Sequence, residues 1–275
     1  MKRKIYSELL KWKKENKGEV ALLIDGARRI GKSYIVEQFA KENYKSYILI
    51  DFNKVGKDIK DLFENYLDKL DIEIRKRIGF EKNKGSFLRL KNRFISECNN
   101  AKGIFAIRKI YKDSLRYLKT IPINKPKDCL KVGIIGELYT AMEPYSNYEL
   151  EKTLASYHIE IKRFTNISYL LWQKKFLLPF MKFRIRKYCK YTLGADGLDN
   201  VYRINYLKRH HFDGVIHTKP TGCTPEIGAI PIMIKEAKDL NIPITFFSFD
   251  EQSGLDGIKT RLEAFYDLLN FKREG

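Results

Sequence analysis

One stretch near the start of the chain has the residue types and spacing of a phosphate-binding loop. The letters GARRIGKS, which begin at Gly26, match the pattern G-x-x-x-x-G-K-[ST]. Gly26 and Gly31 allow backbone N–H groups to wrap phosphate oxygens, and Lys32 can reach the outer phosphates. The hydroxyl of Ser33 can ligate Mg²⁺. The spacing therefore predicts that this loop binds ATP together with Mg²⁺.

A second candidate is Cys223, which lies in a Gly/Pro loop after a short apolar strand at 214–217. Thr224 is a suitable N-cap, and Pro225 is tolerated at the first helical position. We expect the oriented N–H groups of this helix start to favour the thiolate of Cys223, the form that binds metal or attacks electrophiles. The alternative is a small residue packed in a tight loop.

Acidic residues at the ends of expected strands are candidates for acid–base chemistry. Glu137 follows one strand, and Asp250 with Glu251 follows another. Glu226 lies at the start of a helix, where it also complements the helix dipole. The carboxyl ends of parallel strands meet at one edge of a sheet. We therefore expect one crevice to gather the following residues: Glu137, Arg163, Cys223 and residues 250–252.

These candidates must be positioned by alternating strands and helices in the second half of the chain. The apolar strands are expected at 130–135, 159–164, 214–217 and 243–249. Repeated βα units of this kind predict an α/β fold, with a Rossmann-like parallel sheet in the C-terminal domain. A helical segment and a partial P-loop βαβ unit precede it. The predicted domains are 1–71 (P-loop segment), 72–128 (helical connector and proline-containing linker) and 129–275 (Rossmann-like domain).

Composition narrows the function classes. The formal net charge is +19, from 53 basic and 34 acidic residues, and a basic chain is a candidate for binding nucleic acid. The lysines are spread along the chain without a nucleic-acid-binding motif, which argues against nucleic acid as the partner. No apolar run reaches the ~20 residues of a membrane span, and the four cysteines have no paired spacing. We expect a cytoplasmic protein with no membrane association.

The first half resembles prokaryotic ATPases of the AAA type over about the first 70 residues. The loop GARRIGKS and the later strand YILIDF carry this likeness. Such ATPases also need an apolar strand ending in Asp-Glu to hold Mg²⁺, and none follows between residues 71 and 130. The resemblance therefore implies nucleotide binding with poor hydrolysis.

The rest of the chain, about residues 72–275, is similar to the C-terminal half of 2-hydroxyacyl-CoA dehydratase-type proteins, which include 2-hydroxyglutaryl-CoA dehydratase and benzoyl-CoA reductase components. Ordered motifs carry the likeness: VGIIGELY from Val132, GCTPE around Cys223, DEQSG from Asp250 and TRLEAF from Thr260. The resemblance implies an acyl-CoA substrate and an iron–sulfur cluster, with Cys223 as a candidate ligand. A cubane cluster takes several thiolates, so a second dehydratase subunit or an activase is the implied partner.

Three functions remain open on this basis. The first is an iron–sulfur dehydratase-type component, truncated or inactive, fused to a nucleotide-binding segment. The second is a P-loop ATPase that uses Lys32 with Asp250 and Glu251 as its Walker B pair. The third is a basic nucleic-acid-binding protein.

Overall fold

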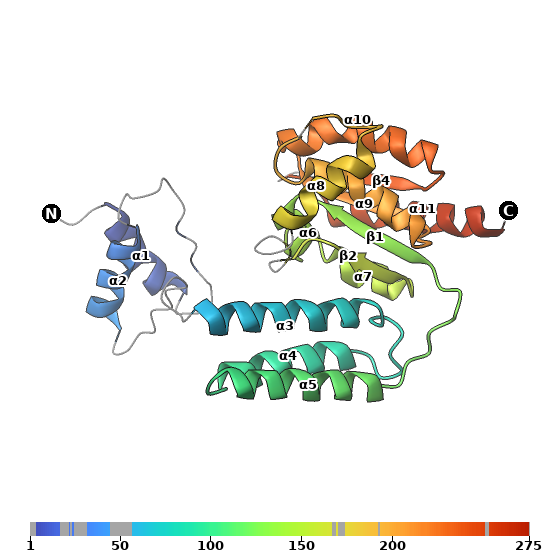
Figure 1. Cartoon of the computed structure of the whole chain (residues 1–275). Coiled ribbons are helices and arrows are strands. Elements are labelled where there is room, and N and C mark those ends of the chain that lie inside the picture. The colour runs from blue at the N-terminus through green and yellow to red at the C-terminus, as the bar shows by residue number, and fades with distance from the viewer. Residues whose placement is uncertain are drawn as a thin grey trace. The chain divides into compact units, whose positions relative to one another are not determined.

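The computed structural model describes residues 4–16, 22, 24, 32–44, 57–166, 169, 174–191, 193–250 and 253–274. The chain folds as two compact units, Met1–Lys57 and Asp58–Gly275 (Figure 1). The domain boundaries expected near residues 71 and 128 stay predictions.

The first unit contains α1 (Lys4–Asn16) and α2 (Lys32–Asn43). The two helices pack through apolar side chains, and the rings of Tyr6 and Phe39 meet edge to face with centroids 5.6 Å apart. The two strands predicted beside the phosphate-binding loop lie almost entirely outside the described residues.

The second unit begins with three helices that lie side by side: α3 (Lys57–Arg75), α4 (Ser86–Asn99) and α5 (Ile104–Thr120) (Figure 1). Each has an apolar stripe, and the stripes form one core in which Phe87 and Phe94 are completely buried. The helices predicted for residues 71–120 are therefore confirmed.

A parallel sheet follows, and its strands lie in the order β2-β1-β3-β4. The strands are β1 (Lys131–Gly136), β2 (Glu160–Arg163), β3 (Gly214–Pro220) and β4 (Ile244–Phe249). All pairings are parallel. The predicted α/β fold with a Rossmann-like parallel sheet is confirmed. The strand order reverses between β1 and β3, and such a switch point is where open α/β sheets place their ligands.

Helices cover both faces of this sheet. They are α6 (Leu138–Met142), α7 (Leu150–Ser156), α8 (Lys174–Ile185), α9 (Gly197–Arg209), α10 (Thr224–Asp239) and α11 (Leu255–Glu274). Leu154 of α7 and Leu262 of α11 share one core with the strands. Ile185, Ile204 and Met233 place α8, α9 and α10 in the core on the other face.

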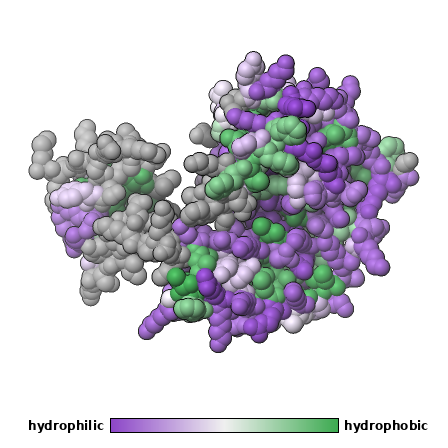
Figure 2. Space-filling model, viewed as in Figure 1, coloured by the Kyte–Doolittle hydropathy of each residue, from purple (hydrophilic) through white to green (hydrophobic). Residues whose placement is uncertain are grey.

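Hydrophilic side chains cover most of the described surface that Figure 2 shows. None of the described helices combines the length and the apolar character that a membrane crossing requires.

The turn between α3 and α4 packs directly against the sheet domain. Gly79 has a φ of +88°, and a Cβ there would lie 2.1 Å from the carbonyl oxygen of Ala155, so this position requires glycine. The ring of Phe80 contacts that of His158, with centroids 6.1 Å apart. The three helices and the sheet domain are therefore in direct contact within the second unit.

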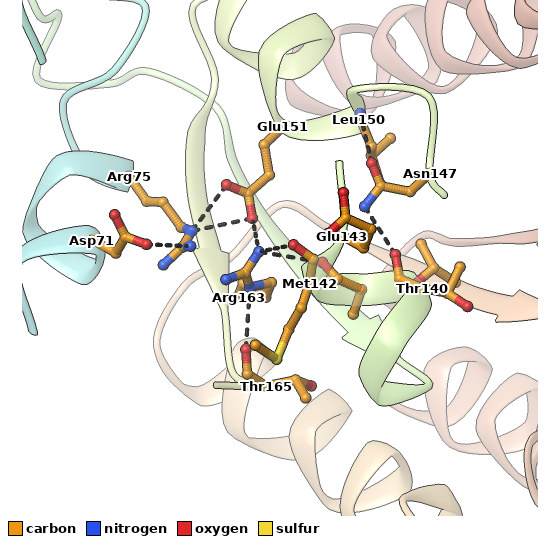
Figure 3. A network of polar contacts seen from close by, with 12 residues as sticks. Asp71, Arg75, Thr140, Met142, Glu143, Asn147, Leu150, Glu151, Arg163 and Thr165 are labelled. Atoms are coloured by element: carbon orange, nitrogen blue, oxygen red, sulfur yellow. Dashed lines mark hydrogen bonds and ion pairs between the residues drawn. The ribbon is translucent and has the colours of Figure 1, made fainter. Parts of the chain in front are cut away.

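A charged network also joins the three helices to the sheet domain (Figure 3). We call this contact region, from the turn at Gly79 to the network around Glu151, the seam. Glu151 of α7 accepts hydrogen bonds from Arg75 Nε at 3.0 and 3.1 Å and from Arg163 Nη1 at 2.8 Å. Arg75 also contacts Asp71, which pairs with Lys91 of α4 at 3.0 Å. Both arginine side chains are only 8% exposed, so these charges are poorly screened by water. The network links α3, α4, α7 and β2.

Candidate functional site

The switch point is built around a close approach of two strand ends. Gly136 ends β1 with a φ of +141°, and a Cβ there would lie 2.0 Å from the carbonyl oxygen of Thr218. The next backbone N–H, of Glu137, donates to that oxygen at 2.9 Å. Only glycine fits at this position, and it brings the loop after β1 against β3.

A buried polar network lies beneath the switch point. Glu226, 1% exposed, accepts from Asn200 Nδ2 at 2.9 Å with each oxygen and lies 2.6 Å from Nε2 of His217. Asn200 Oδ1 accepts from the backbone N–H of Gly136 at 3.1 Å. The network therefore connects β1, β3, α9 and α10. The carboxylate of Glu226 holds elements together, and its burial keeps it from solvent.

Cys223 lies at the N-cap of α10, and the helix itself begins at Thr224. The prediction that Thr224 is the N-cap was therefore wrong by one residue, and Cys223 caps without a side-chain hydrogen bond to the backbone. Burial raises the pKa of the Cys223 thiol, and the carboxylates of Glu226 and Glu137 raise it further. A hydrogen bond with the backbone of Glu226 lowers this pKa, but only in part. The expected stabilisation of the thiolate is thus wrong for the isolated chain, because burial and two carboxylates outweigh the helix start.

Glu137 lies near Cys223, as expected, but its carboxylate is occupied. It accepts from the backbone N–H groups of Tyr139 and Thr140 at 3.1 and 2.8 Å, and from Thr140 Oγ1 at 2.8 Å. This is an N-cap of α6. Arg163 is likewise committed: it binds Glu151 and the carbonyl oxygen of Ala141, at 3.3 Å.

Asp250 follows β4 and lies beside the loop that carries Cys223. Thr221 Oγ1 donates to its Oδ2 at 3.0 Å, and Ser253 Oγ donates to its Oδ1 at 3.0 Å. Asp250 also lines an open cavity of about 1140 Å³, together with Tyr139, Tyr145 and Pro220. Glu251 lies outside the described residues. The strand ends therefore bring Glu137, Cys223 and Asp250 to one edge of the sheet. The expected single crevice is not formed by all of these residues, because only Asp250 lines this cavity, whereas Arg163 lines a separate one.

The phosphate-binding loop falls almost wholly outside the described residues. Gly26 and Gly31 are not described, and of Lys32 and Ser33 only the backbone is described. Those two residues open α2, as a P-loop requires. Their assigned roles stay predictions.

The described residues do not fit a complete iron–sulfur cluster. No group of three metal-ligating His, Cys, Asp or Glu side chains occurs in the described part of the chain. Cys98, Cys129 and Cys189 are buried, whereas Cys223 is half-buried. Burial, with a contribution from Glu97, raises the pKa of Cys98 to about 11, which disfavours it as a thiolate ligand. Cys223 is thus a single candidate ligand.

Two segments of the chain match models of known protein families. The family model of the 2-hydroxyglutaryl-CoA dehydratase D-component matches residues 187–269, and an AAA domain model matches residues 19–121. A comparison with curated proteins found no match. Both resemblances are confirmed, and the chain joins a dehydratase-type component segment to an AAA-type, P-loop-like segment.

The extents of the matches bear on the site. The dehydratase-type match contains Cys223, Glu226 and Asp250, whereas Glu137 precedes it. The AAA match covers the phosphate-binding loop and continues through α5. The helices that pack against the sheet domain thus lie in the AAA match. The expectation that the AAA resemblance ends near residue 70 and that the dehydratase-type resemblance begins at about residue 72 was wrong in its extents.

The sequence did not reveal the partners of Glu226. Neither His217 nor Asn200 belongs to a motif that would pair it with Glu226. The one available signal was the position of His217 on a buried parallel strand, where a polar side chain needs a partner.

Proposed function

We propose that the chain is one component of a 2-hydroxyacyl-CoA dehydratase-type system and that Cys223 supplies one ligand to an iron–sulfur cluster completed by another subunit. The observation that carries the proposal is the position of Cys223, a half-buried thiol at the switch point of a parallel sheet and inside the D-component match. Because the described residues offer one candidate thiol and a cubane needs several, the remaining thiolates belong to a second dehydratase subunit. A neighbouring iron would lower the pKa of the Cys223 thiol that burial raises.

The acidic residues around this edge receive distinct roles in the proposal. Asp250 lines the open cavity and serves, with Glu251, as the acid–base candidate for an acyl-CoA substrate. Glu226 and Glu137 act as positioning residues: Glu226 ties β3 to α10, and Glu137 holds the loop after β1. The cavity, about 1140 Å³, is large enough for an acyl thioester.

For the AAA-type segment we assign ATP with Mg²⁺ as the ligand. Gly26 and Gly31 place backbone N–H groups on the phosphates, Lys32 pairs with the outer phosphates, and Ser33 ligates Mg²⁺. In the family that this chain resembles, the activase is the ATP-driven component, so the activase is a second candidate partner.

The alternative of a single ATPase, with Asp250 and Glu251 as Walker B residues, has less support. The strand before Asp250, β4, pairs with β3 and lies within the dehydratase-type match. The dehydratase-type match therefore explains β4 and the acidic residues after it, and a Walker B role beside the P-loop is not needed to explain them.

One preparation tests both assignments. Tagged chain is purified anaerobically from its native cells, and iron, acid-labile sulfide and bound nucleotide are measured in wild type, Cys223→Ala and Lys32→Ala. We expect Cys223→Ala to lose iron and sulfide but retain nucleotide, and Lys32→Ala to show the reverse. Each variant is thus the control for the other.

Two results would contradict the cluster assignment. One is iron and sulfide retained in Cys223→Ala. The other is a complete cluster in chain produced alone in a foreign host, because the proposal requires ligands from a second subunit.

A further inference from the structure

A second cavity, of about 550 Å³, lies along the outer edge of β2. Its walls come from α3 on one side and from α8 and α9 on the other. It shares no lining residue with the cavity at the strand ends, so it is a separate site. Its volume is in the range of small-molecule pockets.

The walls of this cavity are strongly cationic. The basic side chains are Arg75, Lys76, Lys131, Lys162, Arg163 and Arg203. The one acidic lining residue is Glu160, which pairs with Lys125 at 2.6 Å outside the lining. Arg75 and Arg163 share Glu151, as the network at the seam shows (Figure 3). Lys76 pairs with Glu73, so the lining cations that form no ion pair with an acid among the described residues are Lys131, Lys162 and Arg203. Their positive charge favours an anionic ligand.

Arg203 is the residue that identifies the anion-binding end. It is 1% exposed, and its Nη1 donates to Thr165 Oγ1 at 3.1 Å and to Asn200 Oδ1 at 2.9 Å. Among the described residues, its Nη2 has no hydrogen-bond partner and Arg203 forms no ion pair with an acid. The neighbouring Asp199 pairs instead with Lys174 at 3.0 Å. A buried guanidinium without a counter-charge is unfavourable, and an anion in the cavity would supply one.

Aromatic rings line the same walls. The guanidinium of Arg203 lies over the rings of Phe164 and Tyr169, at 5.4 and 5.0 Å from their centroids. Lys162 Nζ lies 4.4 Å from the ring centroid of Tyr206 and donates to its hydroxyl at 2.8 Å. These rings offer flat apolar surface next to the cations, which suits a ligand with an aromatic body.

We propose that this cavity binds a small aromatic anion whose carboxylate or phosphate group pairs with Arg203. The ring of the ligand packs among Phe164, Tyr202 and Tyr206. Since α3 belongs to the AAA match and α9 to the dehydratase-type match, the ligand contacts both segments. This site is independent of the function proposed for Cys223.

Calorimetric titration of the full chain tests the proposal, with phenyl phosphate and benzoate as probes. Inorganic phosphate and phenol serve as the fragments of phenyl phosphate, and formate and benzyl alcohol serve as the anionic and aromatic fragments for benzoate. All proteins carry Lys32→Ala, so that phosphate bound by the P-loop does not contribute. We expect at least one aromatic anion to bind roughly ten-fold more tightly than either of its fragments. Arg203→Gln should weaken that binding by roughly ten- to a hundred-fold, as loss of a charged hydrogen bond predicts.

The matched control is Arg116→Gln, which removes an exposed arginine of α5 (side chain 78% exposed) and should leave binding unchanged. If Arg203→Gln does not fold, Lys162→Gln, on the more accessible wall, should still weaken binding several-fold. The proposal is overturned if neither aromatic anion binds more tightly than its fragments, or if folded Arg203→Gln binds as tightly as the parent.

Discussion

Replacing Glu151 with alanine is expected to lower the free energy of unfolding of the second unit by about 3 kcal/mol. The substitution leaves Arg75 and Arg163 facing each other across the seam, each 8% exposed and without their shared carboxylate. Removing one partner of a buried ion pair leaves uncompensated charge, which costs more than the pair itself contributes. Urea denaturation followed by circular dichroism measures the change.

A neighbouring surface pair provides the control. Glu149 pairs with Lys152 at 2.5 Å, but the two side chains are 56% and 76% exposed. Glu149→Ala should therefore change stability by less than about 0.5 kcal/mol. Equal effects of the two substitutions would show that the network at the seam contributes no more than a surface ion pair.

The stabilisation from Glu151 should also depend on pH. Burial by itself would raise the pKa of Glu151, but Arg75 and Arg163 outweigh it and hold the pKa below its ordinary value. A carboxyl with a lowered folded-state pKa stabilises the protein at neutral pH, and this contribution is lost as pH falls through that pKa. The difference between wild type and Glu151→Ala should therefore shrink below about pH 4.

Replacing Glu236 with methionine is expected to stabilise the second unit, by about 3 kcal/mol at pH 8. Glu236 lies on α10 with 0% exposure, and neither carboxylate oxygen has a hydrogen-bond partner among the described residues. Burial, with a smaller effect of Asp239, raises the pKa of Glu236 to about 8. The folded state therefore retains a proton that the unfolded chain releases near pH 4.3.

The sign of the pH dependence follows from this difference. Because the folded state binds the extra proton, the penalty is absent below about pH 4 and grows until about pH 8. Urea denaturation at pH 5 and pH 8 should show that the gain from Glu236→Met is larger at pH 8. Glu236→Gln is the matched variant: it removes the titration but keeps buried polar atoms, so its gain should be smaller. A methionine variant that is destabilised, or equally stabilised at both pH values, would contradict this account.

The sheet was predictable because its strands are short, continuous apolar runs, such as the one before Glu137, separated by helical periods. Local chemistry also identified the loop of Cys223, from its glycine, prolines and helix start. The buried partners were not predictable, because Asn200 and Glu226 meet only after α9 and α10 pack. The raised pKa of Cys223 depends in the same way on tertiary contacts, whereas sequence showed only the helix start.

The seam between the helices and the sheet domain was also beyond the reach of sequence patterns. Arg75 and Glu151 are separated by 76 positions and belong to expected domains on either side of a proline-containing linker. The match to the AAA domain ends at residue 121, yet the compact unit begins at Asp58. The border between family matches therefore differs from the border between folded units.

Because the turn at Gly79 and the charged network at Glu151 join them, we infer that α3, α4 and α5 fold together with the sheet domain as one cooperative unit. Native-state hydrogen exchange of the full chain at increasing urea tests this claim most directly. We expect the most protected amides of α4, near Phe94, and of β3, near Ile216, to open with the same free energy and the same dependence on urea. If the α4 amides open with a lower free energy while β3 stays protected, the helices fold separately from the sheet domain and the claim is wrong.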